Sequence, residues 1–369
     1  MNVGYLKNHR KDLTNFLKVE LSHFIKNAEY EKALNIANEI LISNPRESTS
    51  YQIIGKIYSL LGNLEESINY YKKAIKLNPK CSLTYNSLAI ALSEIGENEK
   101  GISFLLKSIN EVGCTPLTFF NMGMIYENLG NWDEAIKNFH NAIKLKPYFP
   151  DAFNNLGNIF YKKTEYNLAL YYLKKSIIQN KKNSIAFHNL ANTQRAAGIY
   201  KDAIKSYKKA LELNPKQTES INGLGLTLYD AFQTKKGIAC FEKILNSDPE
   251  NYKAIRNLAI GNSKIANIKK SIELFKTSTK YLPDCINSIC HLIQLSCFDK
   301  NIETTKLFQK LNKKLSEHQL KIKNDPDMIA LLGFGRSGSL FLQSLFDGHP
   351  EISTLPGYFF KGWFSEKTW

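Results

Sequence analysis

A glycine-rich turn near the carboxyl end carries the residues best suited to hold an anion. The segment Gly333–Ser353 reads GFGRSGSLFLQSLFDGHPEIS, and the apolar run Met328–Phe334 leads into it. We expect a buried strand, a loop of Gly, Ser and Arg, and then a helix that ends near Gly348. The amide N–H groups at the start of such a helix point toward a bound anion, and the helix dipole adds to the attraction. The loop therefore predicts a phosphate-type cradle.

The pattern of a magnesium-dependent nucleotide triphosphatase does not fit this loop. That pattern requires Gly, four residues, Gly, Lys and then Ser or Thr. Gly333 and Gly338 have the spacing, but Ser339 stands in place of the lysine. Leu340 stands in place of the hydroxyl that binds Mg²⁺. These replacements disfavour a triphosphatase.

The loop resembles the 5′-phosphosulfate loop of sulfotransferases, most closely the tyrosylprotein and heparan types. The resemblance covers residues 328–360 and includes the D-x-H-P motif at Asp347–Pro350. It implies that the 5′-phosphosulfate of PAPS (3′-phosphoadenosine 5′-phosphosulfate) is bound by Gly335, Arg336, Ser337, Gly338 and Ser339. Arg336 would be catalytic, because it would neutralise charge on the leaving phosphate as the sulfuryl group moves to an acceptor hydroxyl. No metal is implied, and the catalytic base is left unassigned.

The predicted sulfotransferase segment is short. Each strand and crossover helix of a parallel sheet takes more than about 30 residues, whereas the chain ends at Trp369. We therefore expect residues 328–369 to be the truncated start of such a domain, with weak or no PAPS binding and no sulfuryl transfer. The alternative is a non-enzymatic interaction scaffold with a vestigial C-terminal stub.

A second candidate site is a set of asparagines that recur in the sequence patterns N-M-G, N-L-G and N-L-A. They are Asn121, Asn155, Asn189 and Asn257. An amide offers a donor and an acceptor together, so a row of them could hold an extended peptide backbone regardless of its sequence. The alternative is that asparagine is merely tolerated on a polar helix face. We call these four residues the asparagine ladder.

The elements that must position this ladder follow from a repeat of 34 residues. Prolines fall on one grid, at Pro45, Pro79, Pro147, Pro215, Pro249 and Pro283. Twelve residues before each slot of the grid stands a small residue: Ala33, Ser67, Gly101, Ala135, Ala169, Ala203, Gly237 and Ser271. Small residues permit close helix crossings, and proline ends a helix. Each unit therefore predicts two antiparallel helices.

These units resemble the tetratricopeptide repeat, which has this period. The predicted fold is an all-α superhelical solenoid followed by an incomplete α/β P-loop-like sulfotransferase segment. The predicted boundaries are 1–13 for an N-terminal extension, 14–285 for eight repeats, 286–318 for a divergent capping helix pair, 319–327 for a linker and 328–369 for the truncated segment. The ladder resembles the asparagines that hold a peptide in the superhelix of O-linked N-acetylglucosamine transferases. This implies a protein or peptide partner in a concave groove.

Composition bounds the partners and the location. The formal net charge of +15 favours an acidic partner. The sequence has no run of five or more basic residues, so it does not predict a specific nucleic-acid site. No apolar stretch approaches the ~18 residues of a membrane span. The start lacks the apolar core of a signal peptide, so we expect a cytoplasmic protein. The six cysteines form no CxxC and predict free thiols rather than a metal site, with a weak site among the last three as the alternative.

Overall fold

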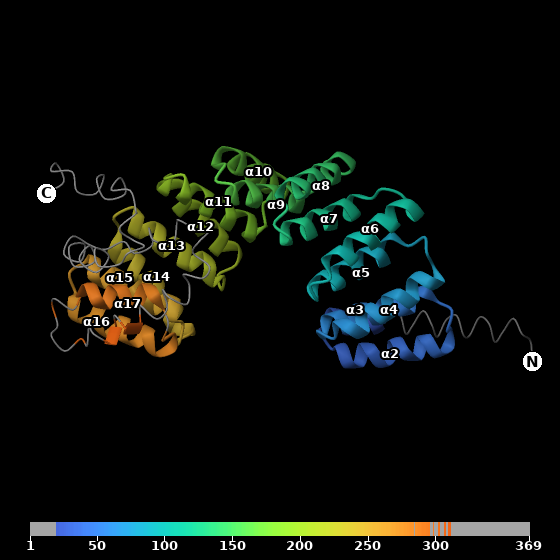
Figure 1. The fold of residues 1–369 in the computed structure, drawn as a ribbon, viewed down its shortest axis with the longest axis horizontal. Coiled ribbons are helices and arrows are strands. Elements are labelled where there is room, and N and C mark those ends of the chain that lie inside the picture. Colours follow the sequence, from blue (N-terminus) through green and yellow to red (C-terminus); the bar gives the residue numbers. More distant parts are fainter. Residues whose placement is uncertain are drawn as a thin grey trace, which may run out of the picture. The chain divides into compact units, whose positions relative to one another are not determined.

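The computed structural model describes residues 20–283 and 285–295, together with 298, 302, 306, 307, 309 and 310. The chain divides into two compact units, residues 1–197 and 198–369, which are considered separately below. In the described residues all the regular secondary structure is helical, without strands (Figure 1). None of these helices is long and apolar enough to cross a membrane.

Two kinds of helix alternate along the chain. The first helices of the pairs are α3 (Ser48–Leu60), α5 (Ser82–Glu94), α7 (Pro116–Asn128), α9 (Pro150–Lys162), α11 (Ser184–Ala196), α13 (Thr218–Asp230), α15 (Tyr252–Lys264) and α17 (Ile286–Leu295). The second helices are α2 (Tyr30–Ser43), α4 (Leu64–Leu77), α6 (Asn98–Val112), α8 (Trp132–Leu145), α10 (Tyr166–Gln179), α12 (Tyr200–Leu213), α14 (Thr234–Ser247) and α16 (Ile268–Tyr281). Within each set the starting residues are spaced by one repeat, so the predicted helix pairs are confirmed.

Small residues hold the two helices of a pair close together, as predicted. Ala135 of α8 and Ala169 of α10 are fully buried. A Cβ atom at Gly157 of α9 would lie 3.3 Å from the carbonyl oxygen of Ala169. At Gly101 of α6, a Cβ atom would lie 2.9 Å from the carbonyl oxygen of Ala89 on α5. In the α15–α16 pair, Ser271 donates a 2.9 Å hydrogen bond to the carbonyl oxygen of Ala259. Larger side chains at these positions would push the helices apart.

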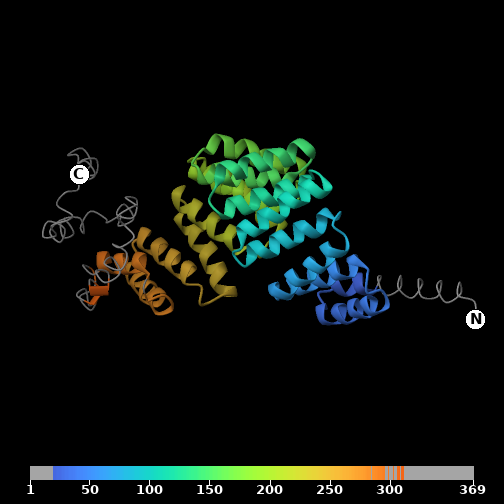
Figure 2. The ribbon, with the colours of Figure 1, turned by 45° about the vertical axis from the view of Figure 1, so that its right-hand side comes forward.

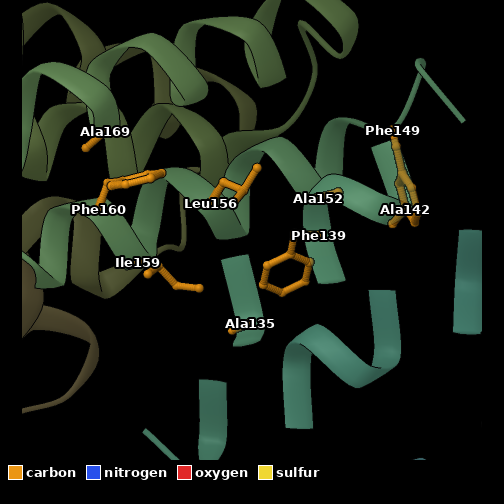
Figure 3. Close-up of a cluster of buried hydrophobic side chains, with 9 residues drawn as sticks. All are labelled: Ala135, Phe139, Ala142, Phe149, Ala152, Leu156, Ile159, Phe160 and Ala169. Carbon is orange, nitrogen blue, oxygen red and sulfur yellow. The ribbon is translucent and has the colours of Figure 1, made fainter. Parts of the chain in front are cut away.

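Large side chains fill the spaces between successive helix pairs. In the first unit, Phe139 of α8 and Leu156 of α9 lie in one buried cluster with smaller residues of α8, α9 and α10 (Figure 3). Phe120 of α7 packs beside this cluster, with its ring centroid 5.6 Å from that of Phe139 and 4.9 Å from that of Phe149. Each pair thus buries its apolar face against its neighbours, as expected of a repeat stack. Figure 2 shows the successive helices of each unit from a second direction.

Several sequence predictions lie outside the described residues. These are the N-terminal extension 1–13, the linker 319–327 and the α/β segment 328–369. The first helix of the predicted capping pair is α17, and the second is described only at scattered residues. The all-α part of the predicted fold is therefore observed, and the α/β part stays a prediction.

Candidate peptide-binding surface

The asparagine ladder lies where neighbouring first helices meet. In the first unit α3 contacts α5, α5 contacts α7 and α9 contacts α11, while in the second unit α13 contacts α15. Successive second helices of the described chain make no comparable contacts. A stack that is tighter along one set of helices curves toward that set. The first helices therefore lie on the inner side of the first unit. We call the face that the first helices form in either unit the first-helix face.

Asn121 of the ladder is held by an asparagine of the preceding first helix. Its Nδ2 donates a 2.9 Å hydrogen bond to Oδ1 of Asn86 on α5. Nδ2 of Asn86 in turn donates to the carbonyl oxygen of Ser82 at 2.8 Å and to the hydroxyl of Thr118 at 3.2 Å. These two acceptors fix the orientation of the Asn86 amide, because its oxygen must then face the Asn121 amide. Asn86 and Asn121 are both buried, so this network joins α5 to α7.

The same pair recurs every second repeat. Asn189 of α11 donates to Oδ1 of Asn154 on α9 at 3.0 Å, and Asn257 of α15 donates to Oδ1 of Asn222 on α13 at 2.8 Å. Three of the four ladder residues therefore bond to the side chain one position earlier in the preceding first helix. We call Asn86, Asn154 and Asn222 the partner asparagines. Asn257 and its partner lie in the second unit and the other two pairs in the first.

Asn155 is the ladder residue without such a partner. The corresponding position on the preceding first helix is Phe120, which has no acceptor to offer. Oδ1 of Asn155 accepts a long 3.4 Å hydrogen bond from Nδ2 of Asn154. Among the described residues, Nδ2 of Asn155 has no hydrogen-bond partner. The side chain is half-buried, so its amide nitrogen is available to a ligand.

More polar side chains lie on α7, α9 and α11. Asn158 donates to Oε1 of Glu127 at 3.2 Å, and Nζ of Lys162 lies 2.8 Å from the same oxygen. The Glu127 side chain is only 14% exposed, so its charge is paired within the surface. On α11, the Asn192 amide lies 2.9 Å from Nε2 of His188. The face between α7 and α11 is thus rich in amides and nearly balanced in charge.

This surface offers hydrogen bonding rather than acid–base or metal chemistry. The titratable groups with shifted pKa values lie elsewhere: burial lowers the pKa of His140 on α8 and of His291 on α17. Within the part of the chain that the structure describes, no cluster of His, Cys, Asp or Glu could hold a metal ion. The residues predicted to bind PAPS, Gly335 to Ser339, lie outside that part.

Comparison with known families fixes the type of repeat. Models of the tetratricopeptide repeat match residues 48–81, 123–164 and 184–217. The chain therefore contains tetratricopeptide repeats. Nothing in the comparisons supports a sulfotransferase segment in residues 328–369. The search of curated proteins found no match.

Several solved structures share this fold. A chain of the APC/C hetero-tetramer Cut9-Hcn1 aligns with a TM-score of 0.56 and 20% identity, over 65% of this chain and 48% of that one. PilW, a type IV pilus biogenesis factor, aligns with a TM-score of 0.51 and 16% identity, over 56% of this chain and 96% of its own. The C-terminal part of a TPR repeat-containing protein from Cytophaga hutchinsonii aligns with a TM-score of 0.50 and 20% identity, over 64% of this chain and 96% of its own. At such identities the likeness shows the fold alone.

The partner asparagines are the residues that the sequence analysis missed. They stand one position before the ladder position in alternate tetratricopeptide units, at Asn86, Asn154 and Asn222. Their spacing of two repeats is a readable signal, because each precedes a ladder asparagine in the next unit. The sequence treats the ladder as four equivalent residues, whereas the structure separates Asn155 from the other three.

Proposed function

We propose that the first-helix face between α7 and α11 binds an extended peptide segment of a partner protein. The observation that carries this proposal is the available amide of Asn155 within a row of half-buried amides. An extended backbone presents N–H and C=O groups at regular intervals, and amide side chains can pair with either kind. Tetratricopeptide-repeat proteins bind protein and peptide partners, which supports this assignment. The chain is then an interaction scaffold.

The ladder residues have different roles under this proposal. Asn121 and Asn189 already use one amide N–H on their partner asparagines, so their first role is to join helices. Asn155, with Asn158 one turn along α9, would make the direct contacts to the peptide backbone. We expect the predicted contacts of Asn121, Asn189 and Asn257 with the peptide to contribute less to its affinity. The net charge of +15 favours an acidic partner. The first-helix face between α7 and α11 is nearly balanced in charge, so added salt should weaken peptide binding there only slightly.

The test begins with random peptides displayed on phage and selected on the immobilised chain. Selected peptides are then titrated calorimetrically into the native protein and the Asn155→Ala/Asn158→Ala variant. We expect affinity to fall at least about tenfold, since each lost hydrogen bond contributes roughly 1 kcal/mol. Asn69→Ala on α4 is the matched control, because Asn69 is an exposed amide of a second helix. Equal affinities in the native and doubly substituted proteins would contradict the proposal.

A second proposal concerns residues 328–369 and rests on the Arg336–Ser339 loop sequence alone. By its resemblance to phosphosulfate loops, this segment would present Arg336 and its neighbours to the 5′-phosphosulfate of PAPS, with weak or no binding expected in this chain. The assay is transfer of labelled sulfate from PAPS to acidic tyrosine peptides and to glycans. Turnover that disappears in Arg336→Ala would assign sulfuryl transfer to the segment. We expect no turnover by this chain, and that outcome would leave the interaction scaffold as its function.

A further inference from the structure

Helix α10 exposes an apolar strip that the repeat scaffold does not use. Leu168, Tyr171 and Ile178 are 42%, 52% and 68% exposed. At 3.6 residues per turn these three residues lie on one side of the helix. The opposite side of α10 carries Ala169 and Leu173, which are fully buried. The helix is therefore apolar on two sides, although only one of them packs in the stack.

The other second helices supply an internal reference for these three positions. In α8 the equivalent residues are Glu134, Lys137 and Lys144, in α4 they are Glu66, Asn69 and Lys76, and in α12 they are Asp202, Lys205 and Glu212. Among the remaining described second helices, only Ile42 of α2 and Ala239 of α14 are apolar there. No other second helix of the described chain is apolar at more than one of the three positions. The fold therefore does not require the apolar strip of α10.

The charged side chains of α10 itself have one sign. Lys174 and Lys175 are exposed on either side of Tyr171 and Ile178 along the helix surface. Nζ of Lys175 lies 5.6 Å from the centroid of the Tyr171 ring. Among the described residues neither lysine forms an ion pair. Helix α10 contains no Asp or Glu, whereas every other second helix of the described chain contains at least one.

The loop before α9 extends this surface at the carboxyl end of α10. Tyr148 is 61% exposed, and its hydroxyl donates a hydrogen bond to the carbonyl oxygen of Gln179. The amide of Gln179 donates in return to the carbonyl oxygen of Pro147 at 2.8 Å. These two bonds fix the loop against the helix end. The exposed ring of Tyr148 is therefore held in place beside α10.

We propose that this face, formed by Leu168, Tyr171, Lys174, Lys175 and Ile178, docks an acidic amphipathic helix of a partner protein. Apolar residues of that helix would cover the strip, because helices pack by fitting ridges of side chains into grooves. Carboxylates at its edges would pair with the two lysines, and the sign of this charge pattern sets the choice of partner. The surface belongs to a second helix, so this inference does not rest on peptide binding at the first-helix face.

The experiment uses the full chain and a synthetic helical probe. The probe is a fluorescein-labelled peptide of about four helical turns, with leucine on one side and glutamate at the edges. Binding is measured by fluorescence anisotropy, and a peptide with lysine in place of glutamate tests the sign of the charge. We expect the acidic peptide to bind and the basic peptide to bind at least about tenfold more weakly.

Two variants and one matched control locate the binding face. Leu168→Glu/Tyr171→Lys/Ile178→Lys installs the residues that α8 carries at the same positions, so the helix should still form. Lys174→Glu/Lys175→Glu reverses the charge and leaves the apolar strip intact. Each is expected to weaken binding of the acidic peptide at least about tenfold. Lys72→Glu/Lys73→Glu makes the same charge change at the same repeat positions of α4 and should leave the affinity unchanged.

Several outcomes would overturn the proposal. One is equal affinity of the acidic peptide for the native chain and the charge-reversed variant, both shown folded by circular dichroism. Another is equal affinity of the chain for the basic and acidic peptides. Self-association of the chain is measured by sedimentation, and its binding to phosphatidylserine vesicles is measured by co-sedimentation. Self-association or vesicle binding that depends on the three apolar residues, without peptide binding, would assign the face to another occupant.

Discussion

Replacement of Asn86 by alanine should destabilise the contact between α5 and α7 far more than replacement of Asn155. Asn86 is almost fully buried, and its side chain takes part in three hydrogen bonds. Two of these cross from α5 to α7, where they reach Thr118 and Asn121. Among the residues that the structure describes, the Asn155 side chain forms only a long hydrogen bond to its neighbour on the same helix. The two substitutions therefore separate a scaffold role from a binding role.

The magnitude follows from the two bonds that cross between the helices. Each contributes about 0.5–1.5 kcal/mol net, and their removal also leaves the Asn121 amide with an unsatisfied buried donor. Asn121 is only 7% exposed, so water cannot fully replace the lost partner. We expect Asn86→Ala to lower the local stability by about 2 kcal/mol. Asn155→Ala should change it by less than about 0.5 kcal/mol.

The assay is amide hydrogen exchange measured by mass spectrometry on peptides from α5 and α7. Repeat arrays open locally, so exchange reports the affected interface more directly than a global melt. A loss of about 2 kcal/mol should speed exchange in these helices about 30-fold, and peptides from α14 serve as the unaffected reference. The Asn86→Ala/Asn121→Ala protein should lose less local stability than the sum of the losses in the two single variants, because both substitutions remove the same hydrogen bond. Unchanged exchange, or an equal effect of Asn155→Ala, would refute this account of the partner asparagines.

Three further predictions address other parts of the repeat stack. Phe232 has a φ of 57° and is 95% exposed. Other repeats have Gly62, Gly96 and Gly130 at this turn position. Because glycine adopts a positive φ without steric cost, Phe232→Gly should stabilise the protein by about 1 kcal/mol in urea denaturation. Burial, with a smaller contribution from Arg256, holds the pKa of His291 below its ordinary value of 6.5. The unfolded chain therefore binds the proton more readily than the folded chain, and the stability of the protein should fall as the pH drops through and below 6.5. Thermal melts should show a smaller loss of stability on acidification for His291→Gln than for the native protein. Burial raises the pKa of the Cys290 thiol to about 11, whereas Cys114 is exposed, so iodoacetamide at neutral pH should label Cys114 and reach Cys290 only after unfolding.

The sequence alone determined the helix pairs, because their signals are local and repeated. Proline at one slot and small residues twelve positions earlier act through steric rules that apply within one unit. Agreement among many units then removes the ambiguity of any single one. For this reason the starts of α3, α5 and α7 fall at the predicted interval. The anion loop around Arg336 has no such repetition, and it stays a prediction from one short pattern.

Only the tertiary structure decided how the recurring asparagines differ from one another. Whether an amide is available depends on what faces it across the helix interface, and that residue lies about one repeat away in sequence. Asn121 faces Asn86 and is held, whereas Asn155 has Phe120 at the corresponding place. The same holds for the strip on α10, because Tyr171 and Ile178 fit a core-facing pattern as well as an exposed one. Side-chain periodicity shows which residues share a side of a helix, but packing against neighbouring helices decides which side is buried.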